Sequence, residues 1–331
     1  TGIASGLGIS GMVAVSLILS FYAIVAGWFI GSLLSPILGL LGLEAASQWV
    51  GSFGTERNLV MMIAFMVMTV SVVRSGVTEG IERWSSRLMP ALFLLFALMI
   101  IYILTLDGAM DGLKMLLVPD TSHFSSALLV SAMGQAFFSL SLGVCSMMVY
   151  GSYLSKDTNL PKTAGQVAIL DTAVAFGAGL LILPAMFVAQ NNGVEIYDAS
   201  GALLSSDTLV FTVLPAMFDT MGSAGIVISI LFFLLMLIAC LTSSISMLEV
   251  PVSCVTEELN KDRKTATWWI GGLITLVSAV IVFNFGDLFG LVITATTVYA
   301  QPILGLCFAL LVGWVWKRDN VLAELKQGNT E

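Results

Sequence analysis

The sequence predicts an all-helical protein that crosses a membrane several times. Hydrophobic residues make up 58% of the 331 positions and charged residues only 10%, whereas a soluble domain carries about 25% charged residues. The mean hydropathy is +0.99. This composition excludes a soluble globular domain, and the net charge of −8 excludes a nucleic-acid-binding protein, which needs a basic surface.

Eight apolar segments are long enough to be membrane spans, which need about 20 apolar residues each. They lie at 8–38, 59–75, 88–106, 127–150, 164–190, 225–255, 266–284 and 289–316. The cysteines Cys145, Cys240, Cys254 and Cys307 all lie in apolar stretches. We therefore expect small buried side chains there and no disulfide or metal framework.

Lysine and arginine predict the orientation of these spans. Eleven of the thirteen basic residues lie on the side of the membrane that holds both ends of the chain, and only Arg57 and Lys114 lie on the other. Because basic loops stay in the cytoplasm, we expect both ends to be cytoplasmic, in a multi-pass protein of the plasma membrane. The chain starts at Thr1 and enters an apolar segment without a signal peptide, from which we expect an internal cut.

The loop 191–224 on the opposite side is too long for a simple connection. It contains the turn residues Asn191, Asn192 and Gly193, followed by an apolar run from Leu209 to Phe218. We expect a short helix that covers an entrance, with a flexible polar loop as the alternative.

Two carboxylates lie inside the spans, Asp171 in the fifth and Glu249 in the sixth. A charge at the bilayer centre costs about 2.5–3.5 kcal/mol on insertion scales, and neither residue has a basic partner in its own span. For Asp171 a bound cation is favoured over a protonated structural carboxyl. For Glu249 the protonated carboxyl is favoured, because nothing nearby in sequence supplies further oxygen ligands.

Small polar residues interrupt two spans. In the fourth, Ser139, Ser141 and Gly143 weaken the helix, which predicts a break that lines a cavity; tight helix packing is the alternative. In the sixth, the Ala239 carbonyl and the Thr242 and Ser243 hydroxyls place hard oxygens on one side of a helix. Such oxygens suit sodium, and local hydrogen bonding to the preceding turn is the alternative.

Four short segments together resemble the neurotransmitter:sodium symporter family, especially its prokaryotic amino-acid transporters. They are 135–143 (QAFFSLSLG), 150–153 (YGSY), 241–244 (LTSS) and 80–83 (GIER) with the following Met89 and Pro90. The resemblance implies a single transmembrane bundle over 1–331 that is part of a five-plus-five inverted repeat. The eight spans would correspond to helices 3 to 10, with 1–106 the remainder of the first repeat and 127–316 the second.

The resemblance also assigns two sodium sites, each incomplete without the family's first helix. Ala239, Thr242 and Ser243 match one site, and Ser139 and Asp171 match the other. Many members carry Asn where this chain has Asp171. A carboxylate there offsets the charge of sodium without chloride, so the resemblance implies transport that is independent of chloride.

For the substrate, the resemblance assigns Tyr22 to the carboxylate and Phe138 to an aromatic lid. The remaining wall would be Ile18, Ser139, Ser141, Val144, Ser243 and Met247. Val144 replaces a Phe common in the family, which implies room for a large apolar or aromatic amino acid. Without the resemblance, Tyr22 and Phe138 would be ordinary core aromatics.

The gates match the family unevenly. Glu257 matches the acidic partner of an inner-gate arginine, and Tyr153 matches its aromatic neighbour. The outer acidic gate has no counterpart, because Val292, Ile293 and Thr294 occupy that region. Gly80 and Pro90 match a motif linked to helix unwinding, with an ordinary loop boundary as the alternative.

Together these features predict a sodium-coupled amino-acid symporter that is not an enzyme, with sodium, an amino acid and membrane lipid as partners. A transporter of another small zwitterion or amine is the alternative within this class. An intramembrane aspartyl hydrolase that uses Asp171 and Asp287 is a remote alternative, because the two carboxylates would have to share a proton or water. A remnant without transport activity is the third.

Overall fold

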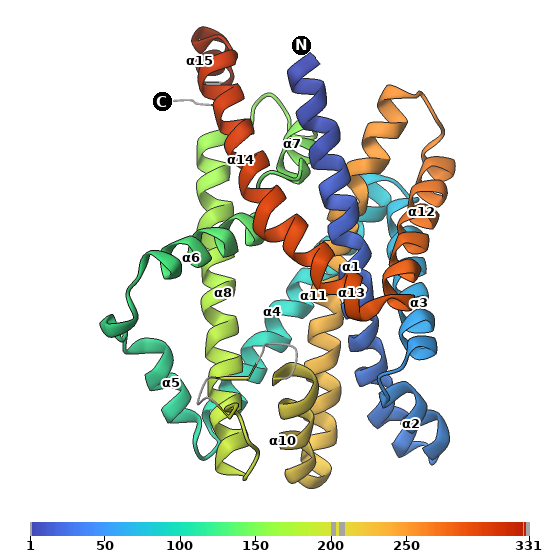
Figure 1. The fold of residues 1–331 in the computed structure, drawn as a ribbon, viewed down its shortest axis with the longest axis vertical. Helices are drawn as coiled ribbons and strands as arrows, with labels where there is room; N and C mark the ends of the chain where they lie inside the picture. Colours follow the sequence, from blue (N-terminus) through green and yellow to red (C-terminus); the bar gives the residue numbers. More distant parts are fainter. Residues whose placement is uncertain (1, 200–202, 205–208, 327, 329–331) are drawn as a thin grey trace.

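The computed structural model describes residues 2–199, 203–204, 209–326 and 328, and these are almost entirely helical (Figure 1). The first half contains α1 (Gly2–Leu40), α2 (Glu44–Gly51), α3 (Thr55–Val73), the π-helical η1 (Val77–Glu82), α4 (Arg83–Leu104), α5 (Ala109–Leu117) and the 3-10 turn η2 (Thr121–His123). Within the described residues the extended backbone pairs once, at a bridge between Tyr197 and Leu203.

The second half continues with α6 (Ser126–Ser139), α7 (Ser146–Ser152), α8 (Leu160–Asn191), the π-helical η3 (Leu209–Val213), α10 (Leu214–Thr220), α11 (Gly222–Glu258) and α12 (Arg263–Phe283). A last long stretch runs through α13 (Phe285–Ile293), η4 (Thr294–Ala300), α14 (Gln301–Leu310) and η5 (Leu311–Val315), and α15 (Arg318–Lys326) follows it.

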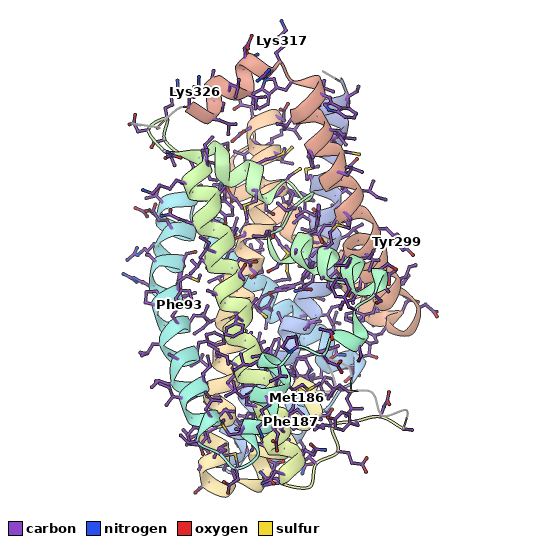
Figure 2. The ribbon with its side chains drawn as sticks, turned by 90° about the vertical axis from the view of Figure 1, so that its left-hand side faces the viewer. Phe93, Met186, Phe187, Tyr299, Lys317 and Lys326 are labelled. Carbon is purple, nitrogen blue, oxygen red and sulfur yellow. The ribbon has the colours of Figure 1, made fainter. Side chains whose placement is uncertain are left out.

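Seven of the eight predicted membrane spans are present as long apolar helices. Among the described residues, seven continuous helical stretches are long and apolar enough to cross a membrane. The predicted span 127–150 is the exception, because it is divided into α6 and α7. The start of α1 and helix α15, and with α15 the residues Lys317 and Lys326, lie at one end of the molecule (Figures 1 and 2).

Some predicted span limits are wrong by up to eleven residues. The third span was expected at 88–106, but its helix starts at Val77 and includes Arg83 and Arg87. Hydropathy locates the part of a helix that lies in hydrocarbon, whereas a helix continues beyond the bilayer as long as its backbone hydrogen bonds do.

Helix α1 forms the centre of the bundle, with α3, α11 and α12 packed against it (Figure 1). Its buried residues run from Gly11 to Gly31. At Gly27 an added Cβ would lie 2.8 Å from the backbone nitrogen of Met62, so glycine permits the close approach of α1 and α3. This apolar packing fixes the helices from which the central side chains project.

The predicted break in the fourth span is confirmed. Between α6 and α7 the backbone has positive φ at Ser141 (52°), Gly143 (81°) and Cys145 (64°). A Cβ on Gly143 would lie 2.4 Å from the carbonyl oxygen of Gln301. Glycine is therefore required here for the broken segment to lie against α14.

The predicted short helix in the loop 191–224 is present as η3 and α10. Phe211 of η3 contacts Trp28 and Phe29 of α1, with ring centroids 5.4 and 4.8 Å apart. Apolar packing thus attaches η3 to α1, and α10 lies at the end of the bundle opposite to the start of α1 (Figure 1).

Candidate functional site

A central cavity of about 380 Å³ lies where the broken segment meets α1, α8 and α11. All eight predicted substrate residues line it: Ile18, Tyr22, Phe138, Ser139, Ser141, Val144, Ser243 and Met247. These residues come from three separate regions of the chain. The fold therefore brings the predicted set together.

The sequence analysis missed several residues of this cavity wall, namely Val15, Gln135, Ser146, Ser246 and Gln301. Two signals were available for the polar ones. Ser246 lies three residues after Ser243, which places both on one helix face, and Gln301 is a polar residue inside an apolar span. Neither signal says which face of the helix meets the cavity.

Asp171 of α8 and Ser139 of α6 meet at the cavity. The Ser139 hydroxyl donates to Asp171 Oδ1 at 2.7 Å. No lysine or arginine in the described part of the chain lies within ion-pair distance of Asp171. A carboxylate and a hydroxyl with no cationic side chain nearby are oxygen ligands suited to a hard cation, so this pair fits sodium.

The second predicted ligand set lies on one turn of α11. Thr242 Oγ1 donates to the Ala239 carbonyl at 2.9 Å and is 3.2 Å from the Ile238 carbonyl. Ser243 lines the central cavity, and Ala239 and Thr242 are not among the residues of its wall. The oxygens of Ala239 and Thr242 are adjacent, through the local hydrogen bond named as the alternative.

Tyr22 of α1 and Ser243 of α11 lie in the wall of the same cavity. Ile18 and Val144 are 3% and 2% exposed and form an apolar wall. The cavity wall thus carries both hydroxyl groups and apolar surface, which suits a molecule with one polar and one apolar end.

A separate polar cluster links the end of α7 with α11 and α12. Glu249 is fully buried, and Arg263 donates to both of its carboxylate oxygens, from Nη1 to Oε1 at 3.0 Å and from Nη2 to Oε2. Tyr153 donates to Oε1 at 2.5 Å. Arg263 also donates to the Val73 carbonyl at 3.1 Å.

The prediction of a protonated structural carboxyl at Glu249 is therefore wrong. Its counter-charge comes from the next helix, because α11 and α12 pack together and a short connection returns Arg263 beside Glu249. A search for a basic residue within one span misses such a partner. Of the two predicted gate residues, Glu257 is exposed and Tyr153 donates a hydrogen bond to Glu249.

The fold, the broken helix and the hard-oxygen cavity define a class of protein, the sodium-dependent membrane transporters. The model of the Sodium:neurotransmitter symporter family matches residues 36–329, and the chain belongs to this family. The resemblance seen in the sequence is thereby confirmed. The family consists of transporters and not of enzymes, so the hydrolase alternative is wrong, and Asp287 lies exposed on α13.

Two bacterial relatives and one solved structure support this membership. The chain is 34% identical to an uncharacterized sodium-dependent transporter, YhdH, of Bacillus subtilis, over 96% of this chain and 72% of the relative. It is 33% identical to an uncharacterized sodium-dependent transporter of Haemophilus influenzae, over 78% and 56%. The crystal structure of MhsT in complex with L-phenylalanine matches with a TM-score of 0.81 and 36% identity, over 98% of this chain and 75% of that one.

Proposed function

We propose that this chain forms the core of a symporter that couples sodium entry to the uptake of an amino acid with a large apolar or aromatic side chain. One observation carries the proposal: Asp171 lies at a cavity lined by hydroxyl and apolar groups, and no lysine or arginine among the described residues forms an ion pair with it. The ligand in the crystal structure of MhsT, L-phenylalanine, is consistent with this substrate class.

Sodium is bound at two sites in this proposal. Asp171 and Ser139 contribute ligands to one, and the Ala239 carbonyl, Thr242 and Ser243 contribute to the other. An ionised carboxylate in a medium of low dielectric needs a cation. Sodium supplies the positive charge that the cavity lacks, and Asp171 makes a chloride counter-ion unnecessary.

The amino acid occupies the same cavity, with its carboxylate near the Tyr22 hydroxyl and its side chain against Ile18, Val144 and Met247. Phe138 closes over it as a lid. Transport then follows alternating access around this site, in which sodium and substrate favour different conformations and so link their movements.

The segments around the site have further roles in this transporter. Residues 1–106 and 127–316 belong to the first and second repeats, and the loop 191–224 covers the extracellular entrance. Tyr153 and Glu257 belong to the inner gate, in which Tyr153 acts through Glu249. The eleven basic residues on the terminus side support cytoplasmic ends in the plasma membrane.

Thermal unfolding of the purified full chain tests the proposal. A ligand that binds only the folded state stabilises it, by about 2.7 kcal/mol at a hundred times its dissociation constant. We expect large apolar and aromatic amino acids to raise the unfolding midpoint in sodium and not in potassium. Decarboxylated amines serve as controls, since they lack the group that meets Tyr22. Equal stabilisation in both salts, or by the amines alone, would contradict the proposal.

A further inference from the structure

The break between α6 and α7 exposes backbone carbonyls in the middle of the bundle. The helical pattern stops at Ser139 and starts again at Ser146. The amides of Leu140, Ser141 and Leu142 still donate to carbonyls of the preceding turn, but among the described residues no backbone amide donates to the Leu142 carbonyl. Water is scarce at this depth, and an unsatisfied carbonyl costs several kcal/mol. Another element must supply hydrogen-bond donors.

Gln301 supplies them. It is the first residue of α14 and is 1% exposed. Its Nε2 lies 3.3 Å from the carbonyl oxygen of Phe137 and 3.3 Å from that of Leu142. One side-chain amide therefore bridges the two ends of the unwound segment.

The surrounding backbone is built to hold this contact. An added Cβ on Gly143 would lie 2.4 Å from the Gln301 carbonyl, and one on Gly305 would lie 2.4 Å from the Phe137 ring. Two glycines, one on each side, thus let the broken segment rest on α14. The π-helical η4 ends directly before Gln301; its wider turns change the direction in which the following residues project.

Glutamine at this position carries a cost to stability. Its Oε1 is buried and has no hydrogen-bond partner among the described residues, and an unpaired buried acceptor is unfavourable. An apolar side chain of the same length would avoid this penalty. The hydrogen bond from the Gln301 amide to the Leu142 carbonyl opposes this penalty, so the net contribution of glutamine to stability is small.

The Phe137 carbonyl that Gln301 contacts lies next to the sodium ligands. Phe137 is followed by the lid residue Phe138 and by Ser139, which donates to Asp171 at 2.7 Å. The segment is therefore held on one side by Gln301 of α14 and on the other by Asp171 of α8. Phe138 also lines a second cavity of about 840 Å³, whose wall includes Ile293, Thr297 and Pro302.

We propose that Gln301 is a positioning residue that holds Ser139 and Phe138 in their binding geometry. Through these residues it connects α14, part of the wall of the second cavity, to the Asp171 site. This inference rests on the proposed function, because it assigns Gln301 a role in sodium binding at that site. Gln301 acts through the broken segment and is not itself a ligand.

The main test is Gln301→Met, which keeps side-chain length and removes both the donors and the unpaired oxygen. We expect the sodium concentration for half-maximal amino-acid binding to rise about fivefold or more, as the loss of two hydrogen bonds predicts, with an unfolding midpoint close to that of the unaltered protein. Gln48→Met, on the exposed surface of α2, is the matched control and should change neither quantity.

Gln301→Asn is the second variant and covers the case in which Gln301→Met fails to fold. It keeps the amide but is one methylene too short to reach both carbonyls, so we expect the same loss of sodium affinity. A double-mutant cycle with Ser139→Ala then separates positioning from general stability. If Gln301 acts through Ser139, the two losses will be clearly less than additive.

The outcomes distinguish the two hypotheses. Unaltered sodium affinity in both Gln301 variants would overturn the role of Gln301, and so would strictly additive losses with Ser139→Ala, while sodium-dependent binding by the unaltered protein would leave the proposed function intact. If the unaltered protein shows no sodium-dependent amino-acid binding, the proposed function itself fails.

Discussion

The two intramembrane carboxylates of this protein have different surroundings. Glu249 is fully buried and receives hydrogen bonds from Arg263 and Tyr153, so its counter-charge is part of the protein. Asp171 receives one hydrogen bond, from Ser139, and faces a cavity. The same chemical group is thus a permanent structural link in one region and an open site in the other.

The difference shows what an intramembrane charge can and cannot indicate. Both residues carry the cost of a charge in a low-dielectric medium, so the cost alone does not identify a binding site. The informative observation is whether the fold supplies a cation within reach. Where it does, removal of the partner should damage stability, and where it does not, removal of the carboxylate should damage ion binding.

Arg263→Met should have the largest effect on stability. It leaves Glu249 buried without its partner, a change that costs about 3–5 kcal/mol in fully buried pairs. Because the Arg263 side chain is 22% exposed, we expect a value near the lower end, measured as a large fall in the thermal unfolding midpoint.

Two variants control this measurement. Arg87→Met, at an exposed position of α4, should leave the midpoint nearly unchanged. Glu249→Gln combined with Arg263→Met should recover part of the loss, since it removes the unpaired charge. An Arg263→Met protein as stable as the original would contradict the view that the ion pair is structural.

Asp171→Asn should have the opposite effect to Arg263→Met, because it should weaken sodium binding and leave stability nearly unchanged. The amide keeps the shape and a contact with Ser139 but lacks the charge, and contacts with a charged group contribute about 1.5–3 kcal/mol. We expect sodium affinity to fall roughly ten- to hundredfold, with little change in the unfolding midpoint without sodium.

Sodium titrations of amino-acid binding measure this effect. Asp111→Asn, at an exposed site where Asp111 pairs with Lys114, is the matched control and should bind sodium normally. Unchanged sodium affinity in Asp171→Asn would remove Asp171 from the site.

A pair of smaller changes compares the two regions directly. Tyr153→Phe and Ser139→Ala each delete one hydroxyl donor to a carboxylate. The first should lower the free energy of unfolding by about 1 kcal/mol. The second should weaken sodium binding several-fold and leave stability nearly unchanged. If both variants affect the same quantity, the distinction between the regions is lost.

Replacement of chloride by gluconate should leave amino-acid uptake unchanged, the smallest effect in this series. The carboxylate of Asp171 already supplies the negative charge that balances sodium, so uptake into liposomes should be the same in either anion. The control is replacement of sodium by potassium at constant chloride, which should abolish uptake. A clear dependence on chloride would indicate that Asp171 is not ionised when sodium binds.

Much of the architecture is predictable because the bilayer imposes it. The length of the apolar segments predicted the spans, and Ser139, Ser141 and Gly143 predicted the break that lies between α6 and α7. Helix ends were less predictable, as the extra turns from Val77 to Arg87 show. Hydropathy depends on the solvent around a helix, and not on where its hydrogen bonds stop.

The candidate site was predictable only in part. Polar residues inside the apolar spans indicated Ser139, Asp171 and Ser243, the family resemblance added Tyr22, and the fold gathers these residues at one cavity. Gln301 was missed because its neighbours in the sequence do not show that it contacts a helix break more than 150 residues earlier.

The amino-acid sequence by itself determined that the chain is helical, lies in a membrane, breaks one helix and carries two costly carboxylates, because each of these depends on composition or on neighbours along the chain. The tertiary structure alone decided which carboxylate is paired and which is open. Arg263 returns beside Glu249 when α11 and α12 pack together, and only the packed bundle leaves Asp171 at a cavity. Ion pairing depends on distance in space, which the order of residues does not fix.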